Sequence, residues 1–270
     1  MASLVWRTGR LAVAACLVSA LAGCEVAVGG LQARAQDEWV RTYTLPSGGG
    51  LTIGNTNGRI DVEGTEASTV EVKATRIVKA TSDAGAKELL ERVVINEAVN
   101  PDGVAIETAR IGGVLIGANV EVQYHVTVPK RTPVRVRTTN GAVIVVAVGG
   151  AVEATTTNGA VTVRESTGAV VATTTNGAVQ VQPATLDAGG IKARTTNGGV
   201  RLILPDDAKA DIDATVTNGG IDAAGLNIES SESSRRHLKG RLNGGGAPVE
   251  ITTTNGGIRI RNRSQARTET

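Results

Sequence analysis

The sequence contains no phenylalanine, and among its 270 residues only two tryptophans and two tyrosines are aromatic. Large aromatic side chains usually contribute much of a globular core. A core in this chain must therefore consist of thin layers of Val, Ile, Leu, Ala and Thr. Glycine is abundant, with 34 residues, but the regular apolar alternation of the second half argues against disorder.

Cysteine is confined to the N-terminal segment, at Cys16 and Cys24. The part of the chain expected to fold has no thiol, which excludes disulfides, thiolate catalysis and cysteine metal sites there. Residues 1–23 also hold two arginines and no acid, so the remaining 26 Lys and Arg balance 26 Asp and Glu. A charge near zero gives no argument for binding nucleic acid.

Residues 1–23 have the pattern of a bacterial signal peptide. Arg7 and Arg10 precede an apolar segment, residues 11–22, that is short for a membrane span. The segment Leu-Ala-Gly-Cys ending at Cys24 resembles the lipobox of bacterial lipoproteins. This resemblance implies that Cys24 is lipidated and anchors the mature chain, with residues 25–38 as a tether. Cleavage after Ala35, giving a secreted or periplasmic protein, is the alternative.

Residues 39–133 are expected to form a β-region with one helix. Period-two alternation predicts strands at 39–45, 50–53, 59–62, 69–78, 93–98, 104–108 and 120–128. Residues 84–93 are rich in helix formers and follow Ser82 and Asp83, which are suited to an N-cap.

Residues 134–261 repeat the phrase Thr-Asn-Gly six times, and a variant occurs at Asn57. The first three copies are 18 residues apart and the next two intervals are 21, while Gly-Ala-Val recurs every nine residues from Gly141 to Gly177. Asn and Gly suit the left-handed backbone of a tight bend, so each copy predicts a corner. Stacked corners would place Asn above Asn, where side-chain amides can form a hydrogen-bonded ladder. The predicted corners are Asn140, Gly141, Asn158, Gly159, Asn176, Gly177, Asn197, Gly198, Asn218, Gly219, Asn255 and Gly256.

The strands between these corners have one apolar face. Val152, Ala154 and Thr156 share that face, while Arg164 and Gln180 fall on the other. Short strands and bends in this rhythm predict an all-β fold, a β-solenoid similar to a single-stranded β-helix with 18–21-residue turns, plus one short helix in the N-terminal part. An antiparallel meander or sandwich is the alternative, although it gives no reason for a nine-residue repeat. Residues 224–246 are expected to be an inserted loop, and residues 262–270 a polar tail.

The combination of a lipobox leader, strands around one helix, the strand end Tyr124–Pro129 and Thr-x-Asn-Gly-x-Val repeats resembles the bacterial putative-adhesin family. The resemblance extends from Trp39 to Arg261. It implies a β-strand-repeat envelope protein, in a family largely of unknown function with some relatives associated with envelope stress responses. It brings no catalytic residues.

Candidates for chemistry are few. The two histidines, His125 and His237, lie in a strand and in a basic segment without obvious partners for a metal or a triad. Carboxylates that could serve a glycosidase are expected in a turn or facing outward on a strand, and they are Asp206, Asp207, Asp211 and Asp213. Calcium β-rolls need an Asp in each repeat, which residues 158–163 lack. No metal or cofactor is therefore expected.

Two surface features could bind a partner. Outward Thr pairs such as Thr155 and Thr157 have the spacing of ice-binding solenoids, but Arg137 and Arg194 interrupt the array. A cluster of basic residues within 224–246 could contact phosphates of lipids or cell-wall polymers. These candidate partner-binding residues are Arg235, Arg236, Lys239 and Arg241.

The sequence thus predicts a non-enzymatic lipoprotein of the cell envelope that acts as an adhesin-like or scaffolding interaction surface. Its expected partners are the membrane, through the lipid anchor, and an envelope polysaccharide or protein, with no nucleic acid. A polysaccharide-acting β-helix enzyme and a component of an envelope-stress sensor are the alternatives.

Overall fold

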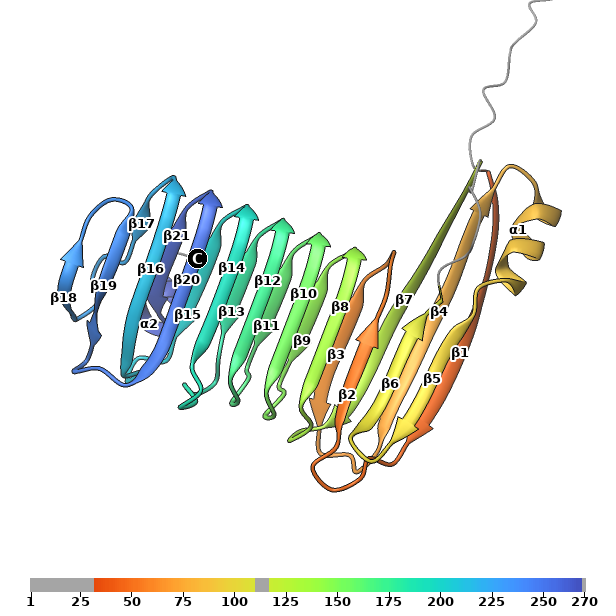
Figure 1. The fold of residues 1–270 in the computed structure, drawn as a ribbon, viewed down its shortest axis with the longest axis horizontal. Coiled ribbons are helices and arrows are strands. Elements are labelled where there is room, and N and C mark those ends of the chain that lie inside the picture. Colours follow the sequence, from red (N-terminus) through yellow and green to blue (C-terminus); the bar gives the residue numbers. More distant parts are fainter. Residues whose placement is uncertain (1–31, 110–116, 269–270) are drawn as a thin grey trace, which may run out of the picture. The chain divides into compact units, whose positions relative to one another are not determined.

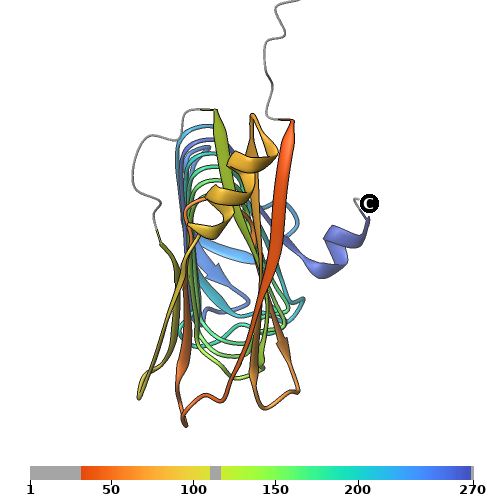
Figure 2. The same cartoon turned by 90° about the vertical axis from the view of Figure 1, so that its right-hand side faces the viewer.

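The computed structural model describes residues 32–109 and 117–268, and two long β-sheets face each other across a thin apolar core (Figures 1 and 2). Cys24 and its lipobox lie outside the described residues. The strands of the first sheet, sheet A, are in spatial order β1 (Ala33–Tyr43), β4 (Val70–Ala80), β7 (Ala118–Pro129), β3 (Ile60–Thr65), β9 (Val143–Val146), β11 (Val161–Arg164), β13 (Val179–Gln182), β15 (Val200–Leu204), β21 (Ile258–Asn262) and β17 (Ile221–Asp222).

The second sheet, sheet B, has one strand more. Its strands are in spatial order β18 (Ile228–Ser233), β19 (His237–Leu242), β16 (Ala210–Asn218), β20 (Ala247–Asn255), β14 (Ile191–Asn197), β12 (Val170–Asn176), β10 (Val152–Asn158), β8 (Val134–Asn140), β2 (Gly50–Gly54), β6 (Gly103–Thr108) and β5 (Ile95–Asn100).

One turn of the chain, called a coil below, consists of a strand in sheet B, an Asn-Gly corner, a strand in sheet A and a return corner. Neighbouring coils pair in parallel and in register, so that Val152 is opposite Val170 and Asn158 is opposite Asn176. Antiparallel pairing is limited to strands near the two ends of the stack, among β1, β4, β7, β5 and β6 and among β16, β18 and β19. The predicted β-solenoid is confirmed, and the antiparallel alternative is wrong for the repeats.

Small and β-branched side chains fill the space between the sheets. Val152, Ala154 and Thr156 point inward and are at most 2% exposed. The buried Thr two residues before each corner Asn in five coils offsets the cost of burying its hydroxyl by donating to a glycine carbonyl of the neighbouring coil, as Thr156 does to Gly141 at 2.9 Å. The described core has one buried aromatic ring, Tyr124, whose pKa is raised to about 12 by burial.

The glycine of each Asn-Gly corner is required by the stacking. Gly159 has φ +156°, a region that L-residues rarely adopt, and a Cβ placed on it would lie 2.1 Å from the carbonyl oxygen of Gly141. Gly141, Gly177 and Gly256 face the same contact with the next coil. The repeated Asn-Gly therefore encodes both the bend and the close approach of successive coils.

The coils do not stack in sequence order. After β14–β15 the chain leaves one position open, builds β16–β17, and returns with β20–β21 to occupy that position (Figure 1). The same exchange occurs near the other end, where β2–β3 lies between β6–β7 and β8–β9. The repeats gave no sign of the exchange of β16–β17 with β20–β21, because β14, β16 and β20 all end in the same Thr-Asn-Gly motif.

Several predicted boundaries need correction. The first strand starts at Ala33 instead of Trp39, so residues 33–38, expected in the tether, pair with β4. Strands from residues 39–133 belong to the same two sheets as the repeats. Residues 224–246, predicted as a loop, contain the antiparallel hairpin β18–β19, which extends sheet B beyond β16.

Two short helices flank the strands. Helix α1 (Asp83–Glu91) is the predicted helix, and the Ser82 hydroxyl accepts from the Gly85 amide at 3.2 Å, as expected of an N-cap. It buries Ala86 and Leu89 and packs against β1 and β4. Helix α2 (Arg263–Thr268) lies in the stretch predicted as a polar tail and projects from sheet A (Figure 2).

Candidate functional site

The Asn-Gly corners bring seven asparagines from distant parts of the sequence into one line, the Asn ladder. Each side-chain amide donates to the side-chain oxygen of the preceding Asn at 2.7–2.8 Å, which confirms the predicted ladder. The first member, Asn57, donates to the carbonyl of Val120 at 3.3 Å. In stacking order the members are Asn57, Asn140, Asn158, Asn176, Asn197, Asn255 and Asn218.

A row of threonines, the Thr row, precedes the Asn ladder by one residue in every coil. Thr56 is half-buried and the other six side chains are exposed. Its members are Thr56, Thr139, Thr157, Thr175, Thr196, Thr254 and Thr217. Arg137 and Arg194, which we expected to interrupt the array, lie two residues earlier, in a separate row with Thr155 and Thr173. The Thr row could have been predicted from the Thr that directly precedes each Asn. The predicted Thr pairs combined this position with the separate row two residues earlier.

Several other outward positions of sheet B carry charges of opposite sign that pair between coils. Arg135 contacts Glu153 at 2.9 Å, and Glu250 is approached by Lys192 at 2.9 Å and by Arg194 at 3.7 Å. The hydrogen bond from Lys192 lowers the pKa of the Glu250 carboxyl. These exposed pairs leave little net charge on this face.

The predicted basic cluster lies on the β18–β19 hairpin, but acidic residues are interleaved with it. Arg241 contacts Glu229 at 3.1 Å, and Lys239 lies opposite Asp213 on the neighbouring strand. Arg235 and Arg236 are exposed in the turn between the two strands. The structure therefore places the four candidates together without forming a uniformly basic patch.

The histidines and acids proposed for chemistry are also accounted for by local contacts. His237 lies between Glu232 (2.9 Å) and Asp213 (3.3 Å), and the hydrogen bond with Glu232 raises the pKa of its imidazole. His125 is exposed on β7. Among the described residues no group of three or more His, Cys, Asp or Glu could hold a metal ion.

Three of the four candidate acids lie beside structural partners: Asp206, Asp211 and, through the contact with His237 described above, Asp213. Asp206 accepts from the backbone amide of Ser264 at 2.9 Å, and this hydrogen bond lowers the pKa of its carboxyl. Asp211 lies on β16 opposite Arg241 of β19. The acids thus support the ends of the stack.

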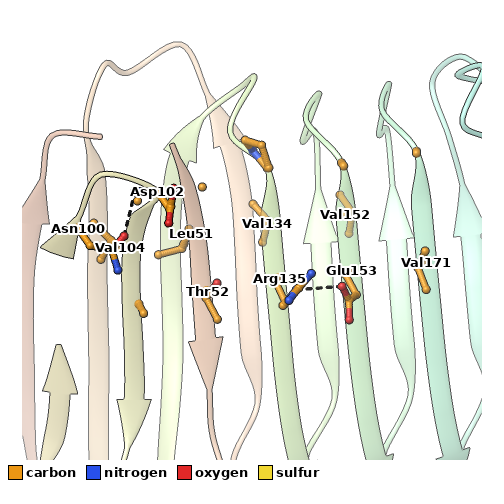
Figure 3. Close-up of a pocket in the computed structure, with 16 residues that line it drawn as sticks. Leu51, Thr52, Asn100, Asp102, Val104, Val134, Arg135, Val152, Glu153 and Val171 are labelled. Atoms are coloured by element: carbon orange, nitrogen blue, oxygen red, sulfur yellow. Dashed lines mark hydrogen bonds and ion pairs between the residues drawn. The ribbon is translucent and has the colours of Figure 1, made fainter. Parts of the chain in front are cut away.

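A shallow depression of about 510 Å³ crosses the outer face of sheet B near the starts of β2, β8 and β10. Figure 3 shows its wall, the turn around Asn100 and Asp102, and its small apolar side chains, including Val104 and Val171. The acid on its floor, Glu153, is engaged by Arg135. This arrangement can accommodate a ligand chain but offers no free pair of carboxylates.

No described helix is long and apolar enough to cross a membrane. The two sheets present regular rows of hydroxyl and amide groups and shallow depressions, and these features are suited to binding.

Comparison with known proteins gives a family model that matches part of the chain and two solved structures of low similarity. The family model Toastrack DUF4097 matches residues 135–261. A putative cell adhesion protein from Clostridium sporogenes ATCC 15579 is 14% identical, with a TM-score of 0.46 over 85% of this chain and 100% of that chain. A putative adhesin from Bacteroides fragilis NCTC 9343 is 13% identical, with a TM-score of 0.37 over 84% of this chain and 97% of that chain. No curated protein matches the chain.

Proposed function

We propose that the protein, whose residues 135–261 match the family model Toastrack DUF4097, is a non-enzymatic lipoprotein of the cell envelope. It acts as an adhesin-like or scaffolding surface. The observation that carries this proposal is the pairing of the Asn ladder with the Thr row, which crosses seven coils without a charged residue. The two putative adhesins share this proposed role by name only, since their similarity is too low to argue from.

The binding mechanism is multivalent. Each ladder Asn uses one amide hydrogen and one oxygen lone pair within the ladder, so a second of each remains for a partner. Coils repeat about every 4.8 Å, and a single hydrogen bond in water contributes only about 1 kcal/mol. Many such contacts along one polymer or protein add up because the later contacts form within an existing complex.

Two features favour binding over catalysis. Several carboxylates are engaged in ion pairs, as in the contacts of Glu250 with Lys192 and of Asp222 with Arg261. The depression in Figure 3 is lined largely by Gly, Ala and Val. Neither arrangement supplies the free acid and base of a polysaccharide-acting enzyme.

The position of β1 supports Cys24 as the first mature residue. Ala33 is 9% exposed and pairs with Ala80 of β4, so cleavage after Ala35 would remove three paired residues from an edge strand. Eight residues separate Cys24 from Ala33, enough for a tether of at most about 28 Å. This geometry favours a domain held close to the membrane.

Binding of the full chain to isolated cell envelopes tests the proposal. The triple variant Thr157→Val, Thr175→Val and Thr196→Val removes three row hydroxyls while keeping β-branched side chains. We expect binding to fall several-fold, because three hydrogen bonds of about 1 kcal/mol are removed in part.

The matched control places the same substitutions on sheet A, at Thr75, Thr127 and Thr162, which are half-buried outside the Thr row. It should bind like the unmodified chain. Equal binding by both triple variants would exclude the Thr row as the interaction surface, and envelope glycan cleavage by the purified chain would exclude the non-enzymatic role.

A further inference from the structure

A second depression, of about 810 Å³, lies on the outer face of sheet A beside α2. We refer to it as the α2 groove. Its floor is formed by β13 and β15, and its sides by α2 and by the return corners that follow β7, β9 and β11. Figure 2 shows α2 standing out from sheet A, and Arg263, Ala266 and Arg267 of this helix line one side of the groove. This face is separate from the Thr row.

Positive charge predominates in the α2 groove. Its lining includes four cations and one acid, namely Lys130, Arg201, Arg263, Arg267 and Glu165. Two further acids flank the groove: Glu66 contacts Lys130 at 2.7 Å, and Asp206 lies near Arg267. Both flanking acids are exposed, so water and salt weaken their effect on a ligand in the groove.

Arg263 fixes the wall of the groove in place. Its Nη2 donates to the carbonyls of Pro183 at 2.7 Å and Ala184 at 3.2 Å, which ties α2 to the corner after β13. Its Nε is buried and has no hydrogen-bond partner within the described part of the chain.

The cations lie at the two ends of the groove. The carbonyl of Lys130 accepts from the amide of Gly149, which lies in the return corner of the neighbouring coil. The next two return corners contain Thr167 and Ala184, and Arg263 is anchored at the second of them. Three corner steps of about 4.8 Å each separate the ends by roughly 14 Å. Between them lie uncharged hydrogen-bonding groups, including Gln180 and Gln182. A ligand that fits this pattern is a linear chain with separated anionic groups and with polar uncharged groups between them.

We propose that the α2 groove binds an acidic polysaccharide. Lys130, Arg201 and Arg267 would contact its carboxylates, since arginine in particular matches a carboxylate with paired N–H donors. Gln180, Gln182 and Thr167 would contact its hydroxyls. No aromatic residue lines the groove to stack on a sugar ring, so affinity depends on charge. This inference deepens the proposed function by naming a class of partner, and it rests on that function only in treating the protein as a binding protein.

The test measures binding of the full chain to alginate, a polymer of uronic acids, at about 50 mM salt, where screening is modest. The double variant Lys130→Gln, Arg267→Gln removes two cations from the groove and leaves the Arg263 anchor intact. The double variant Arg235→Gln, Arg236→Gln makes the same change in net charge on the hairpin. We expect the groove variant to bind about tenfold more weakly and the hairpin variant to stay within about twofold, because two exposed ion pairs are lost in the first case only.

Three further binding measurements distinguish the groove from the Thr row and distinguish acidic polysaccharides from other ligands. The Thr-row triple variant should bind alginate normally, so that failure of the Thr-row proposal and failure of the groove proposal give different results. Neutral dextran should not bind. Equal loss in both double variants, or binding of dextran as tight as that of alginate, would overturn the groove as an acidic-polysaccharide site. Tighter binding of inorganic polyphosphate than of alginate would overturn the choice of a polysaccharide.

Discussion

Replacing the corner glycine Gly159 by alanine tests how tightly the coils are stacked. The added Cβ would lie 2.1 Å from the carbonyl oxygen of Gly141, about 1 Å closer than such atoms approach in practice, and it meets backbone that cannot rotate away. Relief requires the two coils to separate locally. Alanine must also adopt φ near +156°, in a region that is essentially restricted to glycine.

The cost follows from the bonds that cross this contact. The Gly141 amide donates to the Asn158 carbonyl at 2.9 Å, the Thr156 hydroxyl donates to the Gly141 carbonyl at 2.9 Å, and the Asn158 amide donates to Asn140 at 2.7 Å. Weakening three hydrogen bonds of about 1 kcal/mol each, with about 1 kcal/mol of backbone strain, lowers the free energy of unfolding by about 4 kcal/mol.

Urea unfolding followed by circular dichroism measures this loss, and Gly244 supplies the control. Gly244 also has a positive φ, +88°, but a Cβ there meets nothing within 4 Å. Gly244→Ala should therefore cost only the conformational part, about 1 kcal/mol. If Gly159→Ala is no more destabilising than Gly244→Ala, the close approach of the coils at this corner is wrong.

Three other predictions address the ladder, the last coil and the anchor. Asn176→Asp removes the donor to Asn158, so urea unfolding should show a loss of about 1–2 kcal/mol in the free energy of unfolding at neutral pH. The protonated carboxyl of the new Asp can donate in place of the amide, which raises the pKa of this carboxyl in the folded state, so stability should recover on acidification. An unchanged pH profile would contradict the ladder. The hydrogen bond from Arg261 lowers the pKa of Asp222 from 3.8 to about 2. The stability that this ion pair contributes is therefore present above pH 3.8 and is lost as the pH falls toward 2. In Asp222→Asn this part of the acid dependence of unfolding should vanish. Cys24→Ala should move the protein from the membrane to the soluble fraction of cells, and unchanged fractionation would exclude lipidation.

The corners, the buried columns and the Asn ladder could be predicted because each follows from local chemistry repeated at a fixed interval. Asn158 and Gly159 specify a bend wherever they occur, and identical bends stack best in register. The order of the coils could not be predicted in this way. β16 and β20 both present an Asn to the ladder and an apolar face to the core, so either fits beside β14. The choice depends on the connections between them, including the β18–β19 hairpin.

Helix α2, the α2 groove and the acids of the hairpin were not predicted from the sequence, each for a different reason. Helix α2 has no apolar face, but Asn262 and Gln265 exchange hydrogen bonds at 2.9 and 3.1 Å, as in a capping box, and this spacing is visible in the sequence. The α2 groove could not be seen, because its cations come from Lys130, Arg201 and residues 263–267 and meet only after the coils stack. The prediction of a basic cluster on the hairpin missed the acids beside it, because Glu229 and Asp213 lie on the strands that neighbour β19.

The exchanged coil order is the central claim, since it sets the order of the last members of the Asn ladder and the Thr row and places α2, which follows β21, beside β15. Disulfide trapping tests it directly, because residues 31–270 contain no native cysteine. Arg194 is opposite Thr252, and Thr252 is opposite Thr215. The pair Arg194→Cys with Thr252→Cys lies one coil apart, about 4.8 Å, and should oxidise to a disulfide. The pair Arg194→Cys with Thr215→Cys lies two coils apart, about 9.6 Å, too far for a bridge, and should remain reduced. Cross-linking of the second pair but not of the first would show that the coils stack in sequence order and would contradict the structure.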